Sequence, residues 1–419
     1  RDRVGLVVIG APFAISMRQE EHASRNFAAR ARAKLGAEGA LNWAKAQLER
    51  SHDYFEELET RQGSPPTVYN SPQVDARGEI RVDLTSTVLT EGEVALDIAD
   101  HQGAMWGVTA TDEQGKVNIK TASRAFLRNL FELLFGTSRG HAIADAIIQY
   151  RDVNGRQFTS LTQIREVGAS ITAAEFDRMA GFLTVHSAAL VGDTPSGEPA
   201  LHPLNINTCT EEALRAWLLG LKLVPQEGMD DHEGVTAAEV NNLILRLRVF
   251  TTLGESVSQG ATSVLLDNAT AMPDSGWVSI EGDAVKFTAR TGNRISVADP
   301  IADPTIPLAA RVDEDHPRLT DMGLQDVEVR LLFTDIENDL ASVLDTMVAA
   351  GELSEGSRSA ILANAINPRN AEALDTATTT APLCFRSFNI YTIEATGVVN
   401  GQDGRELARY TVRQVAQVA

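Results

Sequence analysis

The feature that most constrains this chain is a charge-free apolar run near its start. Residues 4–17 read VGLVVIGAPFAISM and are bracketed by charged residues on both sides. Fourteen residues are fewer than the roughly 20 that span a bilayer. Three interpretations are therefore open: the core of a signal peptide, a buried helix, or the outer half of a membrane anchor that begins upstream. The residues expected to face lipid or a filament core are Val4, Leu6, Val7, Val8, Ile9, Phe13 and Ile15.

The residues that follow the run favour the anchor. From Arg18 to about Leu58 the chain is rich in Ala, Glu, Arg, Gln and Leu, with apolar residues at spacings of three and four. The run therefore continues into a long amphipathic helix, whereas a cleaved signal ends in a processing site and a break. Pro12 is expected to kink the helix, as lipid-buried helices tolerate. The helix should end at 61–66, which contain a glycine and two prolines.

Beyond this helix, extended and helical patterns alternate. Residues 80–84, 94–98 and 117–119 have apolar side chains at every second position and predict an antiparallel sheet with one wet face. Short helices are predicted at Arg124–Phe135, His141–Arg151, Ser160–Val167, Ala173–Leu183, Glu211–Leu223, Ala237–Val249, Arg318–Ala350 and Ser354–Ala365. The chain is expected to close with a hairpin of Phe388–Ile393 and Leu407–Val418 around a Gly-rich turn.

Four short β segments between residues 254 and 316 are separated by turn sequences and predict a small β-meander insertion. The predicted fold class is therefore α+β, with a long N-terminal helix and an antiparallel sheet that a large helical domain interrupts. The expected boundaries are 1–61 for the helix, 62–122 for the first part of the sheet, 123–253 and 317–380 for the two parts of the helical domain, 254–316 for the β insertion, and 381–419 for the closing strands.

An internal repeat lies in the helical region. Val117–Thr121 leads into the helix at Arg124, and Leu204–Thr208 leads into the helix at Glu211, with an offset of 87 residues. Each extended segment ends in a threonine that can cap the next helix, and Thr208 stands at capping-box spacing from Glu211. Capping and turn formation are the simplest interpretation of these Asn and Thr residues.

Charge and motif content limit the functions that the chain can have. The 37 Lys and Arg against 57 Asp and Glu give a net charge of −20. A phosphate-binding surface needs the opposite sign, so any role with nucleic acid must be local. The sequence contains no nucleophile elbow, phosphate loop or dinucleotide fingerprint in a strand-turn-helix context, and no two histidines are spaced i, i+4. The chain is therefore not expected to be an enzyme.

Two acidic segments are calcium candidates. Asp152 and Asn154 stand in an oxygen-rich segment before a glycine, but the remainder of a calcium-binding loop does not follow. Asp230, Asp231 and Glu233 form a denser run. Ordinary solvated loops are the alternative for both segments.

The chain has two cysteines, Cys209 and Cys384. They are too few for a four-cysteine metal site. They form either one disulfide, which would close a long loop, or two buried free thiols. The sequence leaves both alternatives open.

Residues 158–183 outline two short helices around Gly168, as in a helix-hairpin-helix element. DNA-binding versions have two glycines in the hairpin, whose N–H groups approach phosphate, and basic residues nearby. Here Ala169 and Ser170 follow Gly168, and three acidic residues flank the turn. A structural role is therefore favoured over DNA binding.

Several segments, taken in their order along the chain, resemble the K-type minor pseudopilins of type II secretion systems, which are the general secretion pathway protein K family. The similarity lies in Arg25–Phe27, Ala37–Ala40, Ala110–Lys120, Ile147–Asp152, Phe158–Leu161, Leu183–Ser187, Leu204–Thr208 and, for the closing strand, Ile393–Val399. The resemblance implies an N-terminal helix held in the membrane or in a pseudopilus, a pseudopilin-type antiparallel sheet against it, and a helical domain inserted into that sheet.

The resemblance also implies a function and its setting. The chain would be a non-enzymatic subunit at the tip of a pseudopilus or of a related type IV pilus-like filament, and it would start or cap assembly. Its partners would be I-type and J-type minor pseudopilins, the major pseudopilin filament and the bacterial inner membrane, with a single-pass anchor, a periplasmic head and calcium as an optional ligand. The alternatives are an envelope DNA-binding protein that uses helix-hairpin-helix elements and, less favoured, a secreted hydrolase.

Overall fold

The computed structural model describes residues 2–62, 79–82, 103–188, 202–222, 234–254, 261–280, 283–297, 328–333, 336–366, 381–385, 387–400 and 405–417. The chain divides into two units. Unit 1 contains residues 1–50, 80–111 and 391–419, and unit 2 contains residues 51–79 and 112–390. Helices and antiparallel strands are both present, so the α+β class is confirmed.

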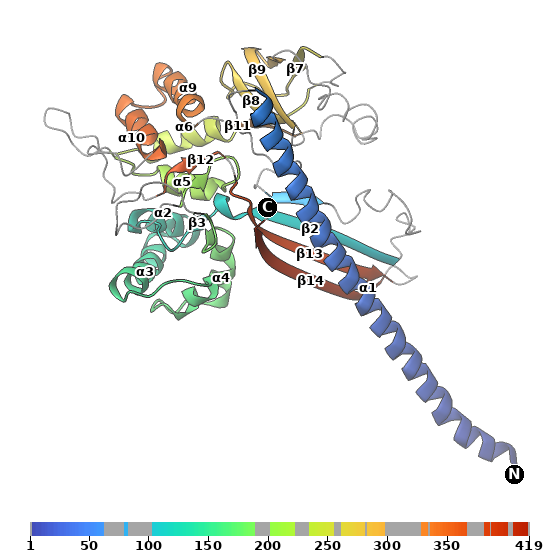
Figure 1. Cartoon of the computed structure of the whole chain (residues 1–419). Helices are drawn as coiled ribbons and strands as arrows, with labels where there is room; N and C mark the ends of the chain where they lie inside the picture. The colour runs from blue at the N-terminus through green and yellow to red at the C-terminus, as the bar shows by residue number, and fades with distance from the viewer. Residues whose placement is uncertain are drawn as a thin grey trace. The chain divides into compact units, whose positions relative to one another are not determined.

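Unit 1 is built on one helix and one sheet (Figure 1). The helix α1 spans Asp2–Gln62, which confirms the predicted long helix. The sheet has the order β1 (Glu79–Val82), β2 (Gly103–Asp112), β13 (Ile390–Asn400) and β14 (Glu406–Gln417). Strands β13 and β14 are antiparallel, because five residues between them are too few for a crossover. They form the predicted closing hairpin. No described helix has the length and apolarity needed to cross a membrane.

Small side chains let α1 lie close against the sheet. The helix buries a stripe spaced by three and four residues, which packs against the β13 residues that point the same way. An ideal Cβ on Gly397 would lie 1.9 Å from the Ala33 carbonyl oxygen, so the helix and β13 touch through their backbones. Trp43 on α1 and Trp106 on β2 meet with ring centroids 5.5 Å apart. The buried helix residues are Ala29, Ala33, Ala37, Ala40, Leu41, Ala44 and Leu48.

The two central strands of this sheet are far apart in the sequence. Strands β2 and β13 are neighbours, although the chain from Glu113 to Asn389 lies between them. Val117 and Ile119, which were expected in the antiparallel sheet, belong to unit 2 instead. There β3 (Val117–Asn118) pairs parallel with β4 (Leu183–Thr184). The expectation was wrong because an alternating pattern predicts a strand without identifying its partner. The expected strand at 94–98 lies outside the described residues.

Seven described α-helices form much of unit 2, and a helix or helical turn lies within each predicted helical segment. The prediction for Arg318–Ala350 was wrong in part, because β11 (Glu328–Leu332) precedes the helix there. In β11, Val329 and Leu331 are both buried at period two, and a strand fits this spacing better than a helix. The helices are α2 (Arg124–Phe135), α3 (Thr137–Ile148), α4 (Ala173–Ala180), α5 (Glu211–Leu218), α6 (Ala237–Leu247), α9 (Ile336–Ala349) and α10 (Glu355–Ile366).

A six-stranded sheet interrupts the second half of unit 2. Its order is β6 (Phe250–Thr252), β11, β8 (Gly276–Ile280), β9 (Asp283–Thr291), β10 (Arg294–Val297) and β7 (Ser263–Leu265). Strands β8, β9 and β10 form an antiparallel meander, as predicted. The sheet extends beyond the expected 254–316 at both ends, because β11 pairs with β6 on one side and β8 on the other.

Candidate functional site: a duplicated turn and two joined hairpins

Unit 2 contains the same turn twice, 87 residues apart. The side-chain oxygen of Asn118 accepts a hydrogen bond from the Lys120 N–H at 2.9 Å, and that of Asn205 accepts one from the Asn207 N–H at 3.0 Å. In both copies the asparagine carbonyl also accepts from the N–H four residues later. The predicted repeat is therefore a repeat of structure, in which the asparagine side chain builds the turn.

Each copy begins with a strand and leads into a capped helix. Strand β3 pairs parallel with β4, and β5 (Leu204–Asn205) pairs parallel with β12 (Leu383–Cys384). The helix caps are Ser123 and Thr210, so the expected capping by Thr208 is wrong. The helix begins two residues later than that expectation required, and the Thr208 hydroxyl donates instead to Asp112 at 2.8 Å.

The first copy continues into a hairpin of α2 and α3. Gly136 joins the two helices with a φ of +80°, a conformation that favours glycine. An ideal Cβ on Gly140 would lie 2.4 Å from the Phe131 carbonyl oxygen, so the helices touch through their backbones. The sequence analysis did not identify this hairpin, although its two glycines four residues apart were the available signal.

The second hairpin lies where the sequence predicted one. It joins the 3₁₀ turn η5 (Leu161–Glu166) to α4, and capping boxes start both elements, at Ser160 with Gln163 and at Thr172 with Glu175. Ser170 in the turn has a φ of +49°.

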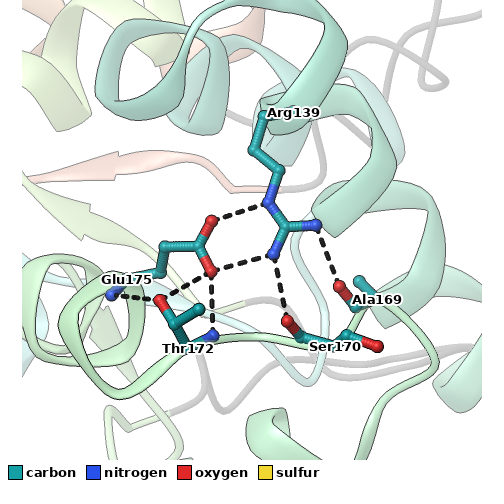
Figure 2. Close-up of polar contacts among 5 residues, drawn as sticks. All are labelled: Arg139, Ala169, Ser170, Thr172 and Glu175. Atoms are coloured by element: carbon teal, nitrogen blue, oxygen red, sulfur yellow. Dashed lines mark hydrogen bonds and ion pairs between the residues drawn. The ribbon is translucent and has the colours of Figure 1, made fainter.

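Arg139 joins the two hairpins (Figure 2). Its Nε and Nη2 donate to the two carboxylate oxygens of Glu175 at 2.7 and 2.8 Å. Its Nη1 donates to the Ala169 carbonyl at 2.9 Å, and its Nη2 reaches the Ser170 carbonyl at 3.4 Å. The Arg139 guanidinium, with help from the Thr172 N–H, lowers the pKa of Glu175 to about 2. The positive charge of Arg139 in the first hairpin is thus neutralised by the Glu175 carboxylate of the second hairpin.

The other charges around the hairpins are also balanced. Residues 112–184 carry nine Lys and Arg against eight Asp and Glu. Arg128 pairs with Asp145 at 2.7 Å. Glu132 accepts a hydrogen bond from the Thr137 hydroxyl at 2.6 Å, which places a carboxylate beside the first turn of α3. A phosphate approaching that helix end would meet this negative charge.

Three exposed arginines in this region lie over aromatic rings. Arg156 lies 5.3 Å from the Tyr150 ring centre, Arg165 lies 6.0 Å from that of Phe176, and Arg178 lies 5.6 Å from that of Phe135. An anion can approach these three exposed guanidinium groups.

Of the calcium candidates, the structure describes Asp152 and Asn154, and it does not gather these two into a site. The Asp152 carboxylate pairs with Arg151, which also donates to the carbonyl oxygens of Ile119 and Ala122. Asn154 is exposed at the end of the same turn. Asp230, Asp231 and Glu233 lie outside the described residues. Across the described ranges, no three His, Cys, Asp or Glu side chains lie close enough to hold a metal ion.

The two cysteines are buried and are not joined by a disulfide in the structure. Both belong to the second copy of the turn: Cys384 pairs with Asn205 across the strands, and the Cys209 N–H donates to the Asn205 carbonyl at 2.8 Å. Burial raises the pKa of the Cys209 thiol. This arrangement corresponds to the free-thiol alternative.

A buried polar cluster around Asp112 was not predicted from the sequence. This carboxylate accepts hydrogen bonds from the Gln114 N–H, the Asn205 amide, and the hydroxyls of Thr208 and Ser387, at 2.8 to 3.0 Å. Burial raises the pKa of Asp112, and the four donors oppose that shift by favouring the carboxylate. The cluster joins residues near the two ends of the inserted segment, Asp112 and Ser387, to the second turn. No sequence pattern identifies it, because Ser387 is 275 positions away.

Residues 112–184, which hold the first turn and both hairpins, match the family described as "Helix-hairpin-helix motif". No curated protein and no solved structure matches the chain significantly. The match covers more than the predicted hairpin at 158–183, because it includes the α2–α3 hairpin. It covers the first copy of the duplicated turn and not the second.

Proposed function

We propose that the chain is a non-enzymatic structural subunit, a minor pseudopilin at the tip of a type II secretion pseudopilus or of a related type IV pilus-like filament. The observation that carries this proposal is the topology of unit 1. A long helix lies against a four-stranded sheet that the chain leaves after β2 and re-enters at β13. A filament subunit needs a helix to pack among its neighbours, and the insertion supplies a bulky head that can limit further addition at a tip.

The side of α1 away from the sheet supports the proposal. Met17, Phe27 and Leu35 are 56%, 76% and 67% exposed. At 100° per residue they lie within an arc of about 80°, on the side of the helix opposite the buried alanine stripe. Apolar side chains on one stripe gain about 25 cal/mol for each Å² that a neighbouring helix covers. The proposed neighbours are helices of the I-type and J-type minor pseudopilins and of the major pseudopilin, with the inner membrane before assembly.

Co-expression of the full chain with I-type and J-type minor pseudopilins tests this function. We expect a complex that survives purification and that F27E/L35E weakens at least tenfold. R30E/R32E is the matched control, because both arginines are exposed on the same helix. Failure of the native chain to join a complex that the two partners form with each other would refute the tip role.

The match to the helix-hairpin-helix motif favours a second candidate, binding of DNA by an envelope protein. The exposed guanidinium groups of Arg165 and Arg178 are the groups that would contact phosphate, whereas Arg139 is occupied by Glu175. If these arginines contact DNA phosphates, the affinity for DNA should fall as the salt concentration rises.

Retention of the full chain on duplex DNA at low salt tests this candidate. If the candidate is right, R165E/R178E abolishes retention and R30E/R32E, which changes the net charge equally, does not. If the native chain is not retained at low salt, the hairpins do not bind DNA. That result would leave the filament proposal standing, because it does not involve the hairpins.

A further inference from the structure

Strand β14 is at the edge of the sheet in unit 1 as far as the described strands show. Among the described strands its one neighbour is β13. It is 12 residues long and contains neither proline nor glycine. The outer side of such a strand presents main-chain N–H and C=O groups that can pair with another strand. Natural proteins usually avoid a long exposed edge strand: the strand is short, is interrupted by proline or is protected by charged side chains.

The two faces of β14 differ in what they contact. Ala408 and Ala416 are buried against the α1 side, and Lys45 of α1 donates to the Gln414 side chain at 3.0 Å. The side chains that alternate with these point to the other face and are all exposed. They are Leu407, Arg409, Thr411, Arg413 and Val415.

This exposed face is basic in an acidic protein. Residues 405–417 contain three arginines and one acidic residue, Glu406, although the whole chain has a net charge of −20. Glu406 accepts from Arg409 at 2.8 Å. Arg405, Arg409 and Arg413 are spaced by four, so they share one face of an extended chain.

The spacing of the arginines disfavours one pairing of two copies at this edge and suits a strand that carries carboxylates. A second copy of β14 pairing antiparallel about Thr411 would place Arg409 opposite Arg413 twice. Like charges directly opposite one another destabilise a strand pair, whereas opposite charges stabilise it. A partner strand with carboxylates at alternate positions meets both arginines favourably.

We propose that the β14 edge is a docking site for an extended acidic segment of another protein, which adds to the sheet as a further strand. Main-chain hydrogen bonds along the edge supply affinity, and carboxylates opposite Arg409 and Arg413 supply specificity and register. This inference stands on unit 1 alone and does not depend on the filament role.

The test uses the full chain and three fluorescent peptides of about ten residues, the upper end of common strand lengths. The first alternates Glu with Val or Thr, the second has Lys in place of Glu, and the third is the acidic peptide with N-methylated backbone amides. Fluorescence anisotropy measures binding at low and at high salt. The protein variants are R409E/R413E and the matched control R30E/R32E, with circular dichroism as the check on folding.

We expect the acidic peptide to bind the native chain and the control variant equally, and R409E/R413E at least tenfold more weakly. High salt should weaken binding, and the Lys and N-methylated peptides should not bind. Absence of binding by the acidic peptide, or equal binding of the Lys peptide, would overturn the proposal. Equal binding of the N-methylated peptide would also overturn it, because it would show that charge alone binds the peptide and that no strand is added to the sheet. A dimer of the native chain that R409E/R413E alters in sedimentation would identify a second copy as the occupant instead.

Discussion

At the scale of single residues, Arg139 holds the two paired hairpins together. Its planar guanidinium binds both oxygens of Glu175 and two carbonyl groups of the opposite turn at once, which the single ammonium of a lysine cannot reproduce. The guanidinium of Arg139 is therefore used to hold the two hairpins together. Asp112 has a comparable role, because it joins the two ends of the inserted segment.

Replacing Arg139 with Gln should destabilise unit 2 by about 1–2 kcal/mol at neutral pH, since the charged hydrogen bonds are lost but are partly screened by solvent. Because Glu175 has a lowered pKa, the stability that the pair contributes is present above its ordinary value of 4.5 and is lost as the pH falls through about 2. The difference between native and R139Q unfolding free energies, measured in urea, should therefore shrink below pH 4.5.

Arg32→Gln is the control for this measurement, because it also removes one positive charge and the Arg32 side chain is exposed. Its effect on the unfolding free energy should be small and should not change between pH 7 and pH 3. A pH-independent effect of R139Q would contradict the assigned ion pair.

The buried thiols make a second residue-scale prediction. Cys209 and Cys384 should resist a thiol reagent in the folded protein, because both are buried and the pKa of Cys209 is raised. In denaturant without reductant, two thiols per chain should react. If none reacts until a reductant is added, the cysteines are bridged, and the disulfide alternative from the sequence is correct.

At the scale of elements, glycines mark the places where backbones touch. Gly397 allows β13 to approach α1, and Gly140 allows α3 to approach α2, because a side chain at either position would overlap a carbonyl oxygen. These two positions require glycine because two backbones approach each other closely there, and not because the chain turns. Gly39 on α1 differs, since a Cβ there meets nothing within 4 Å.

Gly397→Ala should therefore destabilise the packing of α1 on the sheet by about 1–3 kcal/mol, the cost of overfilling a close contact. Gly39→Ala, its matched control, should be neutral or stabilise by roughly 0.5–1 kcal/mol, because alanine is favoured in a helix. Hydrogen exchange followed by mass spectrometry can measure both effects on α1 and β13. Equal protection in the two variants would show that the close approach at Gly397 is not required.

At the scale of the whole molecule, each unit has a hydrophobic core of its own. The cores of unit 1 lie between α1 and the sheet, and the core of unit 2 lies among its helices and the six-stranded sheet. The chain crosses between the units near residues 50, 79, 111 and 390, so unit 1 is complete only when segments far apart in the sequence have met.

This organisation predicts two thermal transitions in calorimetry, since units with separate cores can unfold separately. Gly397→Ala should lower the temperature of one transition and leave the other unchanged. Gly140→Ala should do the reverse. A single transition that both substitutions lower equally would mean that the two units unfold as one.

Much of the secondary structure was predictable because its causes lie within a few residues. The helix α2 was predicted with its observed ends, and α1 and the closing hairpin were predicted from apolar spacing and turn residues. The repeat at Asn118 and Asn205 was also visible, because an asparagine turn needs only its own next two or three residues. Of the candidate site, the hairpin at 158–183 was predicted and its partner hairpin was not.

Local sequence patterns were enough to predict most of the helices, the two asparagine turns, the final hairpin and the acidic charge. Only the tertiary structure decided which strands pair, as with β3 and β11, and which polar groups meet, as with Arg139 and Glu175 or Asp112 and Ser387. The two groups of features differ in the distance along the chain between the residues that determine them. Caps, turns and helical periodicity depend on neighbours along the chain, whereas strand partners and buried polar contacts depend on segments that only the folded core brings together.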